Sequence, residues 1–260
     1  MSINKLFIPF AVTSFFAFLC MNSAASAEAA HEAAHWSYFG ENGPANWAKL
    51  DKANIVCSSG KKQSPIDLIE KNVNHNKSLP KIDFSYLEVP LKVLNNGHTI
   101  QVNYPKGSMV MVGDTKAELL QFHFHTPSEH AFDGKRTAME VHFVNKKEDG
   151  SLLVVGVLMK KGKENKSLAG LFNNFPKKEG PESVVSGEKI NPMNFLPKDD
   201  EYYTYQGSLT TPGCAEIVSW YVMKDKIEVS SDQIKKFKKL FPMDARPLQA
   251  LNGRVVEEKD

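Results

Sequence analysis

The stretch QFHFHTPSEH, Gln121–His130, carries three of the chain's eight histidines within ten residues. In a β-strand alternate side chains share a face, so His123 and His125 point one way with Gln121, and the intervening phenylalanines point the other. The stretch therefore predicts a strand with one imidazole-bearing face and one apolar face that packs on a core.

A second strand is predicted over AMEVHFV, Ala138–Val144, which places Glu140 and His142 on one face. The segment between the two strands is rich in turn formers, so antiparallel pairing is expected, with His142 opposite His123 and His125. Three neutral imidazoles on a rigid sheet leave one coordination position open, as catalytic zinc requires. Taken alone, the His-Phe-His pattern is better explained by two ordinary surface or core histidines.

Histidines that bind a metal usually donate their other ring N–H to an oxygen that orients the ring. Gln121 and Glu140 each lie two residues from a histidine, on the same strand face. We expect both to play this orienting role, and their presence favours the metal site over the ordinary alternative.

Short apolar runs punctuated by turn formers recur along the chain and predict a mainly β (α+β) single domain. The predicted strands are Leu91–Leu94, Thr99–Val102, Ser108–Val112, Leu119–His125, Ala138–Val144, Leu152–Met159 and Ile217–Met223. Short helices are expected at Ser167–Phe175 and at Ser231–Phe241, the latter with Ser231 as N-cap.

The composition is that of an ordinary globular protein: 260 residues, 42% hydrophobic, 24% charged, with a net charge of +2. The sequence has no concentrated basic face of the kind that indicates a nucleic-acid partner. The densest basic run, Lys235–Lys239, is interpreted as the solvated side of the second helix.

The N-terminus has the pattern of a cleavable signal peptide over residues 1–27, with a basic Lys5, an apolar run and an Ala25-Ser26-Ala27 site. A flexible tail is expected over 28–34. The alternative is an uncleaved membrane anchor, for which the run is short. We expect a periplasmic or secreted protein that does not associate with the membrane after cleavage.

Cleavage removes Cys20 and leaves Cys57 and Cys214 as an even pair in an oxidising compartment. A disulfide between them would contribute up to about 5 kcal/mol through loop-closure entropy. Two separate thiols are the alternative.

Motifs spread over the chain in order resemble the α-class carbonic anhydrases, in particular the exported bacterial type. They are HWSYFG (35–40), NGPANW (42–47), KQSPID (62–67), NNGHT (95–99), QFHFHTPSEH (121–130), MEVHFV (139–144), GSLTTPGC (207–214) and RPLQALNGR (246–254). The resemblance implies one domain over 35–257, built on a large, twisted, mostly antiparallel central sheet with short peripheral helices.

The resemblance also implies an activity: the reversible, zinc-dependent hydration of carbon dioxide to bicarbonate and a proton (carbonate dehydratase, a lyase). One Zn²⁺ per chain would be held by His123, His125 and His142. Thr210 matches the threonine that hydrogen-bonds the zinc hydroxide, and Glu129 matches the carboxylate that accepts the threonine's proton. His98 matches the proton shuttle, although by itself it fits an ordinary surface histidine.

Further positions match the walls of the family's site. The apolar wall for carbon dioxide matches Val144, Val154, Leu209, Val218 and Trp220, and the water network matches Tyr38, Asn96, Gln101 and Thr211. Sulfonamides and anions are the expected inhibitors at the zinc, and a homodimer is possible because bacterial relatives often form one. His130 is expected to be hydrogen-bonded and not a metal ligand, and Trp36 to be part of a packing anchor.

Two other functions remain open. Carbonic-anhydrase-like domains that only bind a partner usually lack a ligand histidine, whereas all three are present in this chain. A zinc hydrolase acting on esters would use the same metal, but no separate ester pocket is readable in the sequence.

Overall fold

The central strand pair joins β7 (Thr115–His125) to β10 (Met139–Lys147) in a computed structural model that describes residues 35–260. The predicted signal peptide and tail lie outside the described residues. The two strands pair antiparallel with His142 opposite His123, which confirms the predicted pairing. The segment between them contains a short hairpin, in which Ala131–Phe132 pairs with Lys135–Arg136.

One irregularity in β7 decides which side chains reach the core. Leu119 and Phe122 belong to the same buried cluster, although strict alternation places them on opposite faces. The pairing with β10 skips Leu120, because Leu119 and Gln121 oppose successive residues of that strand. This β-bulge reverses the alternation, so that apolar residues on both sides of it face one core.

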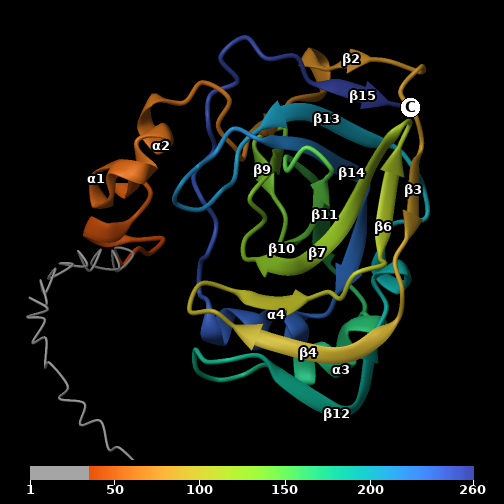
Figure 1. Ribbon diagram of the computed structural model, residues 1–260. Coiled ribbons are helices and arrows are strands. Elements are labelled where there is room, and N and C mark those ends of the chain that lie inside the picture. Colours follow the sequence, from red (N-terminus) through yellow and green to blue (C-terminus); the bar gives the residue numbers. More distant parts are fainter. Residues whose placement is uncertain (1–34) are drawn as a thin grey trace, which may run out of the picture. The chain divides into compact units, whose positions relative to one another are not determined.

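Twelve strands of the described residues form one mixed sheet around this pair (Figure 1). Its main path runs β12-β4-β5-β7-β10-β11-β14-β13-β15-β2, with β6 pairing β7 and β3. All pairs are antiparallel except β11 with β14 and β15 with β2. The remaining bounds are β2 (Asn74–His75), β3 (Ile82–Ser85), β4 (Val89–Asn95), β5 (Ile100–Asn103), β6 (Met109–Val112), β11 (Leu152–Lys161), β12 (Ser183–Ile190), β13 (Tyr202–Gly207), β14 (Val218–Val229) and β15 (Glu257–Lys259). The predicted fold class is therefore confirmed.

The larger core lies on the phenylalanine face of the sheet and is closed by two helices, α3 (Ala169–Asn173) and α4 (Ser231–Leu240), near β4 in Figure 1. The predicted C-terminal helix is confirmed with one correction: its N-cap is Ser230, not Ser231. Ser230 Oγ accepts the backbone N–H of Gln233, whose side chain accepts the backbone N–H of Ser230. This capping box needs a glutamine or glutamate three residues after the cap, and only Ser230 has one.

The other face of the sheet carries the histidines and a smaller apolar cluster. The N-terminal segment, with α1 (Trp47–Leu50) and α2 (Val56–Ser59), packs through Trp47 beside the disulfide between Cys57 and Cys214. A small sheet joins β1 (Asp67–Leu68), β8 (Ala131–Phe132) and β9 (Lys135–Arg136). Single 3₁₀ turns lie at Gly40–Asn42, Lys52–Asn54, Glu70–Asn72, Lys166–Leu168 and Pro192–Phe195. None of the helices in residues 35–260 has the length and apolar character needed to cross a bilayer.

Candidate metal centre and active site

Three imidazoles from two adjacent strands converge on one point. His123 and His125 extend from β7 and His142 extends from β10, with ring centroids 4.6 to 5.3 Å apart. One nitrogen of each ring lies within 4.8 Å of the corresponding nitrogens of the other two. Alternation along paired strands produces this convergence, as the sequence predicted.

Each of these rings uses one nitrogen to donate a hydrogen bond to an oxygen. The pairs are His123 Nδ1 with Gln121 Oε1 at 2.8 Å, His125 Nδ1 with the Asp244 carbonyl at 2.7 Å, and His142 Nε2 with Glu140 Oε1 at 2.9 Å. Because these oxygens can only accept, each bonded nitrogen carries the proton and the opposite nitrogen keeps a free lone pair. The three lone pairs are on Nε2 of His123, Nε2 of His125 and Nδ1 of His142.

Burial keeps the first two rings neutral. Burial lowers the pKa of His123 well below its usual value, and the neighbouring imidazoles lower it further. Burial also lowers the pKa of His125, against the opposing effect of Glu129. His125 Nε2 is buried without any hydrogen-bond partner. Unprotonated, unpartnered imidazole nitrogens that face one another fit a tetrahedral Zn²⁺ with one open position.

A fourth histidine lies behind this centre and serves a different purpose. His130 donates through Nδ1 to Glu140 Oε1 at 2.7 Å and contacts the Tyr205 hydroxyl through Nε2 at 2.7 Å. Burial opposes ionisation of Glu140, but His130 and His142 outweigh it and hold the pKa of this carboxyl well below its usual value. With both ring nitrogens in use, His130 is hydrogen-bonded, as expected, and Glu140 is an anchored acceptor.

A second buried carboxylate faces the centre directly. Glu129 is fully buried, and its Oε1 accepts the backbone N–H of Arg246 at 2.8 Å. Its Oε2 has no hydrogen-bond partner and lies 3.6 Å from His125 Nε2 and 3.9 Å from His142 Nδ1. The hydrogen bond expected from Thr210 is thus not formed in this structure, and the acceptor stays free.

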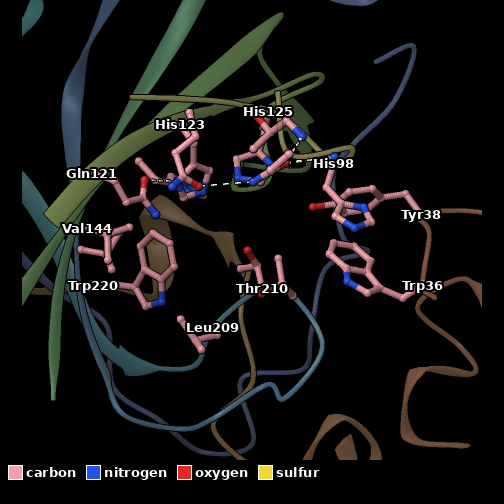
Figure 2. A pocket seen from close by; sticks show the side chains of 16 residues that line it. Trp36, Tyr38, His98, Gln121, His123, His125, Val144, Leu209, Thr210 and Trp220 are labelled. Atoms are coloured by element: carbon pink, nitrogen blue, oxygen red, sulfur yellow. Dashed lines mark hydrogen bonds between the residues drawn. The ribbon is translucent and has the colours of Figure 1, made fainter. Parts of the chain in front are cut away.

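The imidazoles lie at one end of a cavity of about 250 Å³ (Figure 2). Of the predicted apolar residues, Val144, Val154, Leu209 and Trp220 line it, and Thr210 lies beside them. Val218 is buried in the apolar cluster with Trp220 and does not line the cavity. The cavity thus has a polar end with nitrogen lone pairs and an apolar side wall.

His98 also lines the cavity, on the turn between β4 and β5. Asn96 Oδ1 accepts the backbone N–H groups of His98 and Thr99, which fixes the turn, and Gly97 has a φ of +83°. The imidazole stacks on Trp36 with a centroid separation of 3.6 Å and an interplanar angle of 11°. Partial burial lowers the pKa of His98, against the opposing effect of Glu179.

Comparison with known proteins identifies the family. Residues 42–260 match the family model described as eukaryotic-type carbonic anhydrase. A carbonic anhydrase of Nostoc sp. is 41% identical over 92% of this chain and 90% of its own length, and one of Neisseria gonorrhoeae is 39% identical over 92% and 93%. The α-carbonic anhydrase of Thermovibrio ammonificans, solved in complex with the inhibitor sulfanilamide, superposes with a TM-score of 0.83 at 40% identity over 86% of this chain and 99% of its own.

The chain belongs to the eukaryotic-type carbonic anhydrase family. Membership confirms the enzyme class and the fold that the motifs of the sequence predicted.

The residues predicted to order water in a carbonic anhydrase site line the same cavity. They are Tyr38, Asn96, Gln101 and Thr211. Asn96 Nδ2 donates to Gln101 Oε1 at 3.3 Å, so these two side chains are held together on one wall. Burial raises the pKa of Tyr38 well above its usual value, with smaller effects of Glu129 and Asp244, so its hydroxyl remains protonated.

The predicted disulfide is confirmed and lies close to this cavity. Cys57 and Cys214 are bonded across 157 positions of sequence, and Cys214 follows Thr210 by four residues. The Cys214 carbonyl accepts Gln63 Nε2 at 3.0 Å. The bridge and this bond tie the loop that carries Thr210 to the N-terminal segment.

Sequence reasoning missed two contributors to the site. Trp36 was expected only to pack the N-terminus, but it lines the cavity and stacks on His98. The carbonyl of Asp244 orients His125 from 119 positions away. Every residue has a carbonyl, so no residue type could have indicated the second contact.

Proposed function

We propose that this protein hydrates carbon dioxide reversibly to bicarbonate and a proton, using one Zn²⁺ held by His123, His125 and His142. The observation that carries the proposal is the convergence of three imidazole lone pairs, each fixed by a hydrogen bond on the opposite nitrogen. A bound Zn²⁺ supplies a water acidified to a pKa of about 7, for which carbonic anhydrase is the standard example.

Thr210 and Glu129 would orient the attacking oxygen. A threonine hydroxyl can accept a hydrogen bond from that oxygen reliably only when its own proton is donated elsewhere. The buried Oε2 of Glu129 is a suitable acceptor for that proton, because it lies beside two of the imidazoles and makes no hydrogen bond. This chain of bonds would direct the oxygen's lone pair toward the substrate.

Carbon dioxide would rest against the apolar wall. Val144, Val154, Leu209 and Trp220 offer no hydrogen bond toward the cavity that could compete for the substrate, and Trp220 Nε1 donates away to the Ser208 carbonyl at 3.1 Å. An uncharged, apolar substrate is favoured there by burial. The charged product bicarbonate is not stabilised by this apolar wall, which promotes its release.

His98 would carry the proton out of the cavity. Its lowered pKa means that the imidazole is neutral at neutral pH, with a lone pair ready to accept a proton. Tyr38, Asn96 and Gln101 would hold the connecting waters between the imidazole and the reacting centre. The stack on Trp36 leaves the ring edge free to exchange protons with solvent.

Two further proposals concern inhibition and export. The Thermovibrio relative was solved with sulfanilamide, so we expect a sulfonamide to bind this cavity at the metal. The disulfide supports export to an oxidising compartment, as proposed for residues 1–27.

Stopped-flow measurement of carbon dioxide hydration, on zinc-loaded protein and on protein freed of metal by a chelator, tests the proposal. We expect activity with one zinc per central site, its loss with the chelator and its return on adding Zn²⁺. Hydration that persists without metal would overturn the zinc assignment. A protein that holds zinc but hydrates no carbon dioxide would favour a binding role.

A further inference from the structure

A second group of potential ligands lies at the far edge of the sheet, where β2 and β15 pair in parallel (Figure 1). Glu258 of β15 is the register partner of His75 of β2, although the two are more than 180 positions apart in sequence. Glu70 precedes β2 on a 3₁₀ turn, and Asp260 follows β15. We call Glu70, His75, Glu258 and Asp260 the edge cluster.

His75 forms a hydrogen bond with Asp260 and an ion pair with Glu258, and the distances between these atoms also fit a shared cation. His75 Nδ1 lies 3.2 Å from Glu258 Oε2 and 3.1 Å from Asp260 Oδ1. Two ligands of one tetrahedral Zn²⁺, each about 2.0–2.1 Å from the metal, are about 3.3 Å apart. Glu70 also offers an oxygen within 4.8 Å of the ligand atoms of His75 and Glu258.

A buried oxygen without a hydrogen bond is a second indication of a cation-binding site. The side chain of Glu258 is 0% exposed, and its Oε2 makes no hydrogen bond. Oε1 is engaged by Lys224 Nζ, whereas the group beside Oε2 is His75 Nδ1, which carries charge only when its ring is protonated. A buried carboxylate oxygen without a donor is costly, and a metal ion in contact with it would remove that cost.

The surroundings hold these groups in place before any ion binds. Glu70 Oε2 accepts the hydroxyl of Tyr203 at 2.7 Å, which leaves its other oxygen available. The backbone N–H of Asn76 donates to the Glu258 carbonyl at 2.8 Å and fixes the two strands beside the cluster. Three carboxylates face Lys224 and Lys77, so the carboxylates outnumber the lysines when the His75 imidazole is neutral, which favours a cation.

We propose that the edge cluster binds a second divalent cation of the first transition row, with Zn²⁺ as its representative. One imidazole with two or three carboxylates suits such an ion better than Ca²⁺, which prefers an all-oxygen set of six to eight ligands. The ion would join β15 to β2 and to the turn before it. Its role is structural, because its ligands are mostly anionic and neutralise the charge that would activate a bound water.

The experiment is equilibrium dialysis of the full mature protein, with its central site loaded, against buffered free Zn²⁺, followed by elemental analysis. We expect the wild-type protein to bind one zinc more per chain than His75→Ala at the same free Zn²⁺ concentration. His75 is an exposed side chain, so this variant should fold normally. Glu201→Gln is the matched control, because Glu201 contacts the same Lys224 but does not belong to the cluster.

Further readouts separate the edge cluster from the central site. In the wild type and the control, Zn²⁺ should raise the melting temperature beyond the value with the central site filled, and His75→Ala should lose at least about nine-tenths of that increment. Carbon dioxide hydration should be equal in all three proteins. Equal zinc content in wild type and His75→Ala, or tighter binding of Ca²⁺ that is insensitive to His75→Ala, would overturn the proposal.

Discussion

Histidine and carboxylate side chains lie together at two places on one sheet. The two places differ in which of these groups faces the point where an ion would bind. In the central cluster of His123, His125 and His142, imidazoles face the shared point and Glu140 lies one step behind as an orienting acceptor. In the edge cluster the carboxylates of Glu258 and Asp260 face the shared point together with His75.

This difference has a chemical consequence. Three neutral ligands leave a bound Zn²⁺ with its full charge, so it can acidify a coordinated water. Two or three carboxylates neutralise the ion, so it can hold strands together without activating water. Burial supports the same division: His125 is 1% exposed, whereas the His75 side chain is 55% exposed. The position of the carboxylate therefore decides whether a histidine site can activate water or only hold strands together.

The largest expected effect comes from His142→Ala. Removal of one of three ligands should prevent the central cluster from holding zinc and lower hydration activity by at least about a thousandfold. The edge cluster should keep its ion, because the two sites share no residue. Zinc analysis and stopped-flow kinetics check this, and a variant with normal activity would show that the three-histidine assignment is wrong.

Loss of the disulfide should lower the stability of the fold more than it lowers zinc binding at either cluster. Replacing Cys57 and Cys214 with serine should lower the free energy of unfolding by about 2–5 kcal/mol, because a very long loop is no longer closed in the unfolded chain. Denaturant titration measures this. Hydration activity should fall more than the zinc content of either cluster, because the bridge holds the loop that carries Thr210. An unchanged unfolding midpoint would contradict the expected loss of stability.

Glu140→Gln tests the orienting carboxylate of the central cluster. The amide can still accept from His142 but no longer supplies a charge, so zinc affinity should fall roughly 10- to 100-fold. Competition with a chelator of known affinity gives the measurement. An affinity equal to that of wild type would mean that the ring is oriented by packing alone, and the contrast with the edge cluster would lose its basis.

His98→Ala should separate proton export from the reaction at the centre. The imidazole stacks on Trp36 and is not one of the three central ligands, so kcat/KM should stay nearly unchanged while kcat falls roughly tenfold in weak buffer. Added imidazole should restore much of the loss. Equal losses in kcat and kcat/KM would place His98 in the chemical step or in the structure of the site.

The smallest effect concerns the packing of His98 on Trp36. Burial is the main cause of the lowered pKa of His98, so Trp36→Ala should expose the ring and raise this pKa toward its usual value. NMR titration of the imidazole measures the change. Phe39→Ala is the control, because Phe39 is an exposed aromatic residue of the same segment. A pKa that does not rise in Trp36→Ala would show that the stack does not desolvate the ring.

Local patterns were sufficient for much of the fold and of the candidate site. Strict alternation in 121–125 and 138–144 predicted both strands, their shared histidine face and the partners Gln121 and Glu140. The strand β13 was not predicted, because five of its six residues are buried and its YYTYQG sequence alternates poorly. Buried on both faces, such a strand has no polar side to produce a period of two.

Sequence by itself determined which side chains share a strand face and which motifs the chain shares with its family, because both are properties of neighbouring residues. Tertiary structure alone decided the bulge at Leu120, the contact of the Asp244 carbonyl with His125, and the meeting of Glu258 with His75. Each of these depends on how distant strands align when the sheet forms. Local periodicity carries no information about that alignment, which is set by the packing of the whole core.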